Sequence, residues 1–309
     1  MLLPVVLLLA SCVTGVSPRE AAKAYYDLGN AYAQLGDQNK ASAAYLRALQ
    51  LDSSLFQASY NLARAYIESD QYAKATSLLD GLLKKDPHNT ITLETLGYAA
   101  YRQGKLEIAL DYYRRVLEIA PAEKNALYNV ALILEKQGKN EEALVTFKRL
   151  YAVSSDPTVL SHMGMLDIAL GDLPDGIHNL EAYRQEKGDN FDVLVALGRA
   201  YQKEQQFDRA ISAYDAAIAL KPTAADVLFD KATVLLTAID EGKEGLKILH
   251  AAIEAGFSDK VKAKALASNP NLVEADQVRL MLSDSRLITV EKPPEATPPV
   301  QGKAPPKTP

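Results

Sequence analysis

The sequence has 309 residues, of which 48% are hydrophobic and 24% charged, which is ample for a large folded domain. The net charge of −5 gives no electrostatic basis for binding nucleic acid. A single cysteine excludes a disulfide within the chain. No apolar run reaches the roughly 20 residues that a helix needs to cross a bilayer.

The chain opens on an almost wholly apolar run, Met1 to Ala10, followed by Ser11 and Cys12. Such a run is too short to span a membrane and is typical of the hydrophobic region of an export signal. The ending Leu9-Ala10-Ser11-Cys12 resembles the lipobox of bacterial lipoproteins. The resemblance implies that residues 1–11 are a signal peptide and that Cys12 is lipidated, with a diacylglyceryl thiol and an acylated amine, as in palmitate-bearing lipoproteins.

A lipidated Cys12 would anchor the exported protein to a membrane, because each buried methylene contributes about 0.8 kcal/mol. Val13 follows the cysteine, and no aspartate stands there to indicate inner-membrane retention, so we expect attachment to the outer membrane, facing the periplasm. Residues 12–21 form a tether of at most roughly 35 Å, which would hold the following domain close to the membrane. The alternative is a plain secretory signal in which Cys12 is incidental.

From residue 22 to residue 256, a pattern of small and large residues recurs every 34 positions. Within each unit, apolar residues fall at helical spacing in two blocks. A glycine separates the blocks at Gly36, Gly104, Gly138 and Gly171, where a helix can end in a left-handed conformation. Each unit is therefore predicted to be two antiparallel helices joined by a short turn.

About seven units begin near Ala22, Phe56, Thr90, Lys124, Pro157, Phe191 and Ala225. The seventh aligns only with one extra residue near Glu241. Small residues recur in register on both helices, for example Gly29 with Ala41, and we expect them to let the helices approach closely. Large residues such as Tyr45 are expected to fill the space between successive pairs, because one hairpin cannot bury its apolar face alone.

This spacing resembles the tetratricopeptide repeat (TPR). The resemblance implies an all-α fold, an α-α superhelix or solenoid of about seven TPR hairpins over residues 22–256. Asp167 and Lys231 interrupt apolar positions of the pattern. Residues 257–287 are predicted to form C-terminal capping helices, from Asp259 to Ala267 and from Glu274 to Leu282. Residues 288–309 are rich in proline and poor in large apolar residues, which predicts a disordered tail.

No pattern of catalytic or metal-binding residues stands out. The four histidines are scattered, with no pair at the i, i+4 spacing of a helical metal site. Gly104-Lys105 is followed by Leu106 rather than the Ser or Thr of a phosphate loop. We therefore expect no enzyme activity, no metal and no cofactor.

In TPR proteins the concave face, formed by the first helices, often takes an extended peptide or a partner helix. The family's register places these candidate partner-binding residues on it: Tyr26, Asn30, Tyr60, Asn61, Arg64, Tyr98, Tyr101, Arg102, Tyr128, Asn129, Leu132 and Lys136. Asparagine amides can pair with both groups of a peptide backbone, and tyrosine and arginine often dominate interface energies. The alternative is that several of these tyrosines pack against the neighbouring first helix.

Chaperone-binding members of the family grip a C-terminal carboxylate with two asparagines and three cations. Asn30 and Asn61 match that pattern, but Tyr26, Ile91 and Thr95 stand where cations belong. An apolar or aromatic-tolerant peptide is therefore the expected ligand. The sequence predicts a non-catalytic, lipid-anchored scaffold that recruits a membrane-associated protein or peptide partner to the cell envelope, possible roles including assembly of an outer-membrane complex. The alternative is a ligand-binding or transport-associated envelope lipoprotein.

Overall fold

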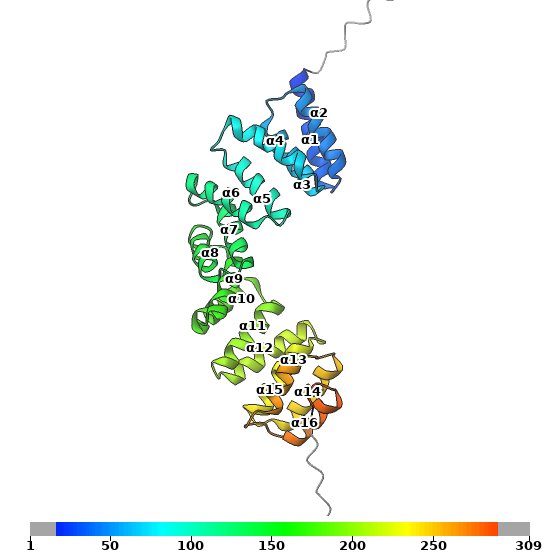
Figure 1. Ribbon diagram of the computed structural model, residues 1–309, viewed down its shortest axis with the longest axis vertical. Coiled ribbons are helices and arrows are strands. Elements are labelled where there is room, and N and C mark those ends of the chain that lie inside the picture. Colours follow the sequence, from blue (N-terminus) through cyan, green and yellow to red (C-terminus); the bar gives the residue numbers. More distant parts are fainter. Residues whose placement is uncertain (1–16, 290–309) are drawn as a thin grey trace, which may run out of the picture. The chain divides into compact units, whose positions relative to one another are not determined.

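The computed structural model describes residues 17–289, which form sixteen helices and no strands (Figure 1). The predicted signal peptide, the lipidated Cys12 and the proline-rich tail from residue 290 onward lie outside the described residues. Contacts divide the chain into two compact units, and the division falls between Leu166 and Asp167, within α9. An α-α solenoid of helical hairpins, as predicted, is confirmed.

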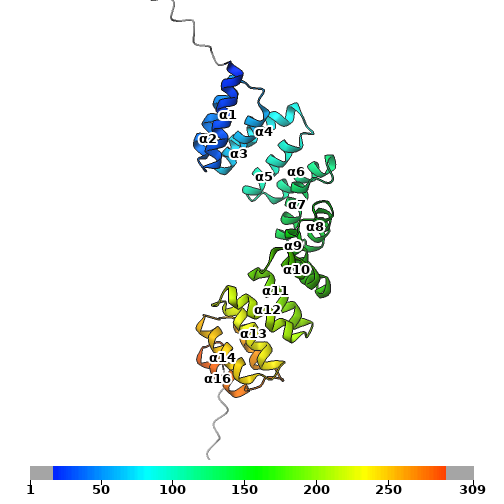
Figure 2. The same ribbon diagram turned by 180° about the vertical axis from the view of Figure 1, so that it is seen from behind.

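The first unit holds α1 (Pro18–Gln34), α2 (Gln38–Leu51), α3 (Phe56–Glu68), α4 (Tyr72–Lys85), α5 (Thr90–Arg102), α6 (Leu106–Ile119), α7 (Lys124–Lys136), α8 (Asn140–Ser154) and most of α9 (Thr158–Leu170). The last residues of α9 belong to the second unit. The second unit holds α10 (Leu173–Lys187), α11 (Phe191–Lys203), α12 (Phe207–Leu220), α13 (Ala225–Thr237), α14 (Gly242–Glu254), α15 (Lys260–Ala267) and α16 (Ala275–Asp284). Odd and even helices up to α14 are the first and second helices of the seven repeats, and Figure 2 shows the same hairpins from behind.

Six of the seven first helices begin within one residue of the predicted repeat starts. The exception is α1, which begins at Pro18 because Ser17 and Glu20 form a capping box that starts the helix earlier. The Ser17 hydroxyl accepts from the Glu20 amide at 3.2 Å, and the Glu20 carboxylate accepts from the Ser17 amide at 2.9 Å. The predicted extra residue near Glu241 is also found, since α14 starts at Gly242 and buries Gly245.

The turn inside each hairpin requires one residue with positive φ. Glycine supplies it in four repeats, as the sequence predicted, with φ between 72° at Gly104 and 91° at Gly171. In the other three repeats the same place is occupied by Asp70, Gln205 and Asp240, at φ 56°, 57° and 59°. The turn geometry is therefore set by the packing of the two helices, because these side chains adopt it at a cost of roughly 1 kcal/mol each.

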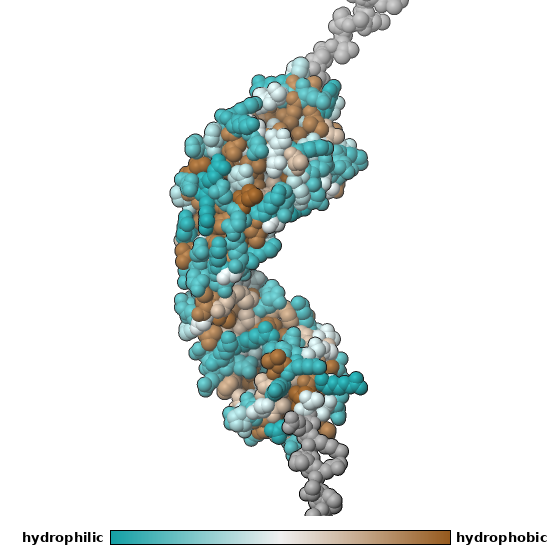
Figure 3. Space-filling view, viewed as in Figure 1, coloured by the Kyte–Doolittle hydropathy of each residue, from teal (hydrophilic) through white to brown (hydrophobic). Residues whose placement is uncertain are grey.

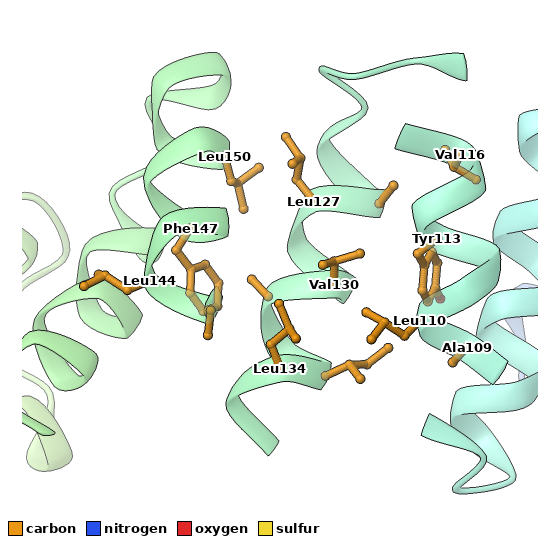
Figure 4. Close-up of a cluster of buried hydrophobic side chains, with 14 of the residues drawn as sticks. Ala109, Leu110, Tyr113, Val116, Leu127, Val130, Leu134, Leu144, Phe147 and Leu150 are labelled. Atoms are coloured by element: carbon orange, nitrogen blue, oxygen red, sulfur yellow. The ribbon is translucent and has the colours of Figure 1, made fainter. Parts of the chain in front are cut away.

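In the first unit, buried side chains of α5 to α9 form one large cluster, and two smaller clusters lie among α2 to α5. Figure 4 shows Leu127, Val130 and Leu134 of α7 lying between the buried side chains of α6 and those of α8, with Tyr113 on one side and Phe147 on the other. Each repeat therefore supplies one wall of its neighbour's core, as expected for stacked repeats.

Small residues on the first helices are explained by aromatic rings on the second. A Cβ atom at Gly29 would lie 2.5 Å from Cε1 of Tyr45, and one at Gly198 would lie 2.4 Å from Cε1 of Tyr214. Tyr45 therefore packs on the small residue of its own hairpin, in addition to contacting buried Leu62 of the next repeat. The large residues were predicted to fill the space between successive hairpins, and Tyr45 also packs within its own hairpin.

The second unit contains a buried ionic network that joins two repeats to the C-terminal cap. Asp230 of α13 accepts from Arg199 Nε of α11 at 2.7 Å and from Lys262 Nζ of α15 at 2.8 Å. Its side chain is only 11% exposed, so its charge is held by these two cations. Nearby, Phe229 and Phe257 stack with ring centroids 3.9 Å apart. These contacts attach α15 to the last hairpin, and α16 joins the same buried cluster through Val278 and Leu282.

The two polar residues that interrupt the apolar pattern have partners within the second unit. Asn179 Nδ2 donates to Asp167 Oδ2 at 2.7 Å, and Lys231 Nζ lies 2.6 Å from Asp215 Oδ1. Both interrupting residues are therefore accommodated by polar contacts within the repeat array.

Candidate partner-binding surface

A polar pocket of about 380 Å³ opens between the first helices α1 and α3. Polar side chains from three helices line it: Asn30, Gln34, Gln38, Asn61, Arg64 and Glu68. The two asparagines are connected directly, because Asn61 Nδ2 donates to Asn30 Oδ1 at 2.8 Å. Tyr45 OH donates to the same oxygen at 2.8 Å. The pocket is therefore held by an amide network that crosses from the first repeat to the second.

Tyr26 lies at one side of this network, with its hydroxyl 3.5 Å from Asn61 Nδ2 and its ring 6.1 Å from the Tyr45 ring. The Tyr45 hydroxyl reaches the pocket because Gly29 leaves room for its ring against α1. Burial raises the pKa of Tyr45, so this hydroxyl stays protonated and donates its hydrogen bond at neutral pH. The pocket thus depends on residues of α2 as well as on the first helices.

Further along the same surface, Tyr98 and Arg102 of α5 meet Glu68 of α3. Tyr98 OH donates to Glu68 Oε1 at 2.6 Å, and Arg102 Nη1 donates to Glu68 Oε2 at 2.7 Å. The hydrogen bond from Tyr98, followed by the pairing with Arg102, lowers the pKa of Glu68 below its usual value. The carboxylate is therefore ionised at neutral pH, and the stabilisation it gives would be lost as the pH falls through that lowered pKa.

The remaining candidates of the second and third repeats serve as inter-repeat contacts. Tyr60 OH donates to Asn89 Oδ1 at 2.9 Å and accepts from Thr92 Oγ1 at 3.1 Å, which ties α3 to the start of α5. Lys136 Nζ lies 5.4 Å from the centroid of the Tyr101 ring, a cation–π distance between repeats three and four.

Around α7, an aromatic cluster lies beside a histidine. Tyr128 packs edge-on against His162 with centroids 6.1 Å apart, and His162 stacks on Phe147 at 4.7 Å. His162 Nδ1 lies 3.1 Å from Glu135 Oε2.

Asn129 and Leu132 lie on the same helix, α7. Asn129 Nδ2 donates to the carbonyl of Asn125 at 2.8 Å, and Leu132 is half-buried against the core of the first unit. The asparagine amide is therefore engaged by its own helix rather than by the network around Asn30 and Asn61.

The structure thus groups the candidates into separate clusters. Asn30, Asn61, Arg64 and Tyr26 come together at the α1–α3 pocket, and Tyr98 with Arg102 adjoins it through Glu68. Tyr101, Tyr128 and Lys136 lie in other inter-repeat contacts. Arg64 contributes a charged group to the pocket, and it is exposed.

The candidate residues predicted from the sequence do not include Tyr45, Glu68 or Glu135, which the structure places on this surface. The signal was present in part, because Glu68 precedes Arg102 by one 34-residue period. The repeat pattern identified Tyr45 as a large residue of a second helix, but it did not indicate that the Tyr45 hydroxyl reaches the pocket beside Gly29.

No cluster of three potential metal-ligating side chains occurs within residues 17–289. In the same part of the chain, no helix is both long and apolar enough to cross a membrane.

Burial, aided by Glu123, raises the pKa of Glu94 on α5, which leaves this carboxyl easier to protonate than an exposed one.

The folded chain is a stack of two-helix repeats that presents polar and aromatic side chains from its first helices. Family models of the tetratricopeptide repeat match it in three places: the cytochrome c-type biogenesis protein H TPR domain over residues 17–127 and single TPR repeats over 125–153 and 191–224. The chain therefore carries tetratricopeptide repeats, as the sequence pattern indicated.

A curated relative, tetratricopeptide repeat protein 8 of Caenorhabditis elegans, is 23% identical over 190 residues, which cover 60% of this chain and 38% of that protein. Among solved structures, PilF of Pseudomonas aeruginosa superposes with a TM-score of 0.58 at 22% identity, covering 67% of this chain and 95% of that one. YrrB, described as a TPR protein with an unusual peptide-binding site, superposes at 0.55 with 17% identity, covering 60% and 96%.

These likenesses establish the fold. The chain spans less than two fifths of the length of the curated relative, so no whole-protein activity follows from that match. TPR scaffolds bind protein or peptide partners and are generally non-catalytic.

Proposed function

We propose that this protein is a non-catalytic, lipid-anchored TPR scaffold that binds a protein or peptide partner at the α1–α3 pocket and recruits it to the cell envelope. The single observation that carries the proposal is the pocket itself, where amides, a guanidinium and a carboxylate gather on neighbouring first helices. Amide side chains both donate and accept, so they suit the backbone of an extended peptide.

Several features support a peptide ligand. Asn30 and Asn61 use only part of their hydrogen-bonding capacity in the bonds to each other and to Tyr45. The guanidinium of Arg64 adds a positive charge to the same pocket. Tyr98 and Arg102 extend the surface towards the third repeat through Glu68. The similar fold of YrrB includes a peptide-binding site, and the family model over residues 17–127 is named for a biogenesis protein, which is consistent with a role in assembling other proteins.

Site-specific photo-crosslinking tests the location of the partner. A photoreactive amino acid at Gln34 or Arg64 is expected to capture a partner in cells, whereas the same group at Asp111, exposed on the second helix α6, is expected to capture none. Arg64→Ala should weaken binding of the captured partner about tenfold, the effect of losing one interface contact of about 1.4 kcal/mol. Calorimetry with the purified partner measures it.

The Arg64→Ala variant should fold normally, because the residue is exposed and alanine favours helix. Its melting temperature provides that control. Capture from Asp111 but from neither pocket position would place the partner elsewhere and contradict the proposal.

The anchoring part of the proposal rests on Cys12, the lone cysteine of the chain, and on its lipobox-like context. Cys12→Ala is expected to release the protein from the membrane fraction and to abolish incorporation of radiolabelled palmitate. Both are measured by fractionation and metabolic labelling, with a Ser11→Ala variant as the matched control that keeps the thiol. Unchanged membrane attachment of the Cys12→Ala protein would argue against lipidation and favour a plain secretory signal.

A second candidate function, a carrier for a small or transported ligand, is favoured by the polar lining of the pocket between α1 and α3. Affinity purification from solubilised membranes separates the two functions. A stoichiometric protein partner supports the scaffold, whereas a partnerless protein carrying a small molecule supports the carrier.

A further inference from the structure

A second pocket of about 780 Å³ shares no residue with the α1–α3 pocket and lies between the second helices α2 and α4, with α3 as its floor. We call it the α2–α4 groove. It is lined by Leu46, Leu49, Ser53, Ser59, Leu62, Tyr66, Ala73, Lys74, Ser77, Leu78, Gly81, Leu82 and Lys85. Figure 3 shows that apolar patches remain exposed on the otherwise hydrophilic surface of this unit.

The groove combines apolar walls with charge of one sign. Five of its thirteen lining residues are leucines, and Leu46 keeps 41% of its surface exposed. Lys74 and Lys85 are its charged groups, and no carboxylate is among the described residues that line it. Lys74 Nζ donates to Gln71 Oε1 at 2.8 Å, so its charge is hydrogen-bonded but not neutralised. An occupant that buries leucine-like side chains and carries carboxylates would complement this groove.

The same groove recurs two repeats later, between α6 and α8, and there it is charged. The positions of Leu46, Ala73 and Gly81 are taken by Arg114, Glu141 and Arg149 in that later groove. Its sides are connected across the groove, because Arg114 Nη2 lies 3.8 Å from Glu142 Oε2. Arg149 Nη2 also donates to the carbonyl of Pro121 at 3.3 Å.

Repeats two and three carry charged residues at the equivalent three positions. Asp80, Glu107 and Arg115 stand at the same three positions there. Within the first four repeats, these three positions therefore carry leucine, alanine and glycine at the α2–α4 groove and charged residues at the two later places. A solvated repeat surface does not require this difference.

Gly81 is the clearest departure. It lies inside α4, where glycine costs roughly 1 kcal/mol relative to alanine. A Cβ atom there would meet nothing within 4 Å, so no close approach of helices explains the glycine. Gly81 leaves the groove open at the position that Arg115 and Arg149 occupy in the next two repeats.

We propose that the α2–α4 groove is a second docking site and that it takes an amphipathic helix of a partner protein, with leucine-like residues on one face and acidic residues flanking them. A helix fits better than an extended strand because it satisfies its own backbone hydrogen bonds, and the leucine-lined groove offers few groups to replace them. Ala73 to Lys85 of α4 rise about 18 Å at 1.5 Å per residue, which matches a helix of about three turns. Lys74 and Lys85 select the acidic flanks.

The test uses a synthetic helical peptide of about 14 residues, stapled on its outer face, with leucines at i, i+3, i+4 and i+7 and glutamates flanking them. Fluorescence anisotropy measures its binding to the full chain. Gly81→Arg and Leu46→Arg copy residues that the chain carries in its other grooves, so they are expected to fold normally, which circular dichroism checks. Each should weaken binding at least tenfold.

Two matched controls accompany these variants. A peptide with lysine in place of glutamate should bind at least tenfold more weakly than the acidic one. The Arg64→Ala variant should bind the acidic peptide as the wild type does, since Arg64 lies in the other pocket. This also distinguishes the groove from the proposed partner pocket, because either site can fail without the other.

Three outcomes would overturn the proposal. Binding that is undetectable, or that is equal for both peptides and for Gly81→Arg, would show that the groove selects no acidic helix. A wild-type dimer in analytical ultracentrifugation that Gly81→Arg makes monomeric would show that a second copy of the chain occupies the groove. Binding that occurs only after residues 1–16 are removed would show that the chain's own apolar segment occupies it.

Discussion

Replacing Gly198 with alanine is expected to destabilise the second unit by about 2 kcal/mol. The new Cβ atom would lie 2.4 Å from Cε1 of Tyr214. That ring is fully buried, and its hydroxyl donates to Gln202 Oε1 at 2.9 Å, so the ring is held at both ends. Overpacking of this kind costs 1–3 kcal/mol or more and outweighs the roughly 1 kcal/mol that alanine gains in a helix. Chemical denaturation followed by circular dichroism measures the change.

The third repeat provides the matched control. At Gly97 the added Cβ atom would lie 3.0 Å from the Tyr113 ring, so Gly97→Ala should cost much less than Gly198→Ala.

The second repeat indicates how the clash can be relieved, because there alanine at Ala63 coexists with a buried leucine at Leu79. The double variant Gly198→Ala with Tyr214→Leu should lose less stability than the two single variants together. We expect its loss in the free energy of unfolding to be smaller than the sum of the two single losses by at least about 1 kcal/mol. Strict additivity would show that the ring does not limit this position.

Removing the carboxylate of Asp230 is expected to cost about 2 kcal/mol. In Asp230→Ala, Arg199 and Lys262 would lose the acceptor that binds both, and α11, α13 and α15 would lose their shared contact. Breaking a buried pair can cost 3–5 kcal/mol. We expect the lower figure because the two cations remain 45% and 36% exposed and can be hydrated.

Thermal and denaturant unfolding of Asp230→Ala measure this loss, and Asp230→Asn should recover part of it by keeping one acceptor. Glu244→Gln is the control, since its pair with Lys247 is exposed and spans 3.4 Å; it should change stability by less than about 0.5 kcal/mol. A similar loss in the control and in Asp230→Ala would show that the buried network adds nothing beyond a surface pair.

The interpretation of the surface depends on the same kind of long-range contact. Tyr60 is a candidate binding residue by its register, yet its hydroxyl is engaged by Asn89 and Thr92 of the next repeat. Arg64 is also a candidate binding residue by its register, but it lines the α1–α3 pocket. For this reason the binding test uses Arg64, whereas Tyr60→Ala would disturb the start of α5 as well as any partner contact.

The sequence by itself determined the helices, the seven hairpins and the cap, because these depend on spacings of three, four and 34 residues that can be read along the chain. It also showed that Gly36 and its counterparts would need a left-handed backbone. Only the tertiary structure decided which side chains meet: Tyr45 with Asn30, Glu68 with Arg102, Asp230 with two cations, and the leucines that leave one groove apolar. Such pairs depend on where each side chain lies once neighbouring repeats are stacked, and a 34-residue spacing such as that of Glu68 and Arg102 does not by itself show which side chains meet.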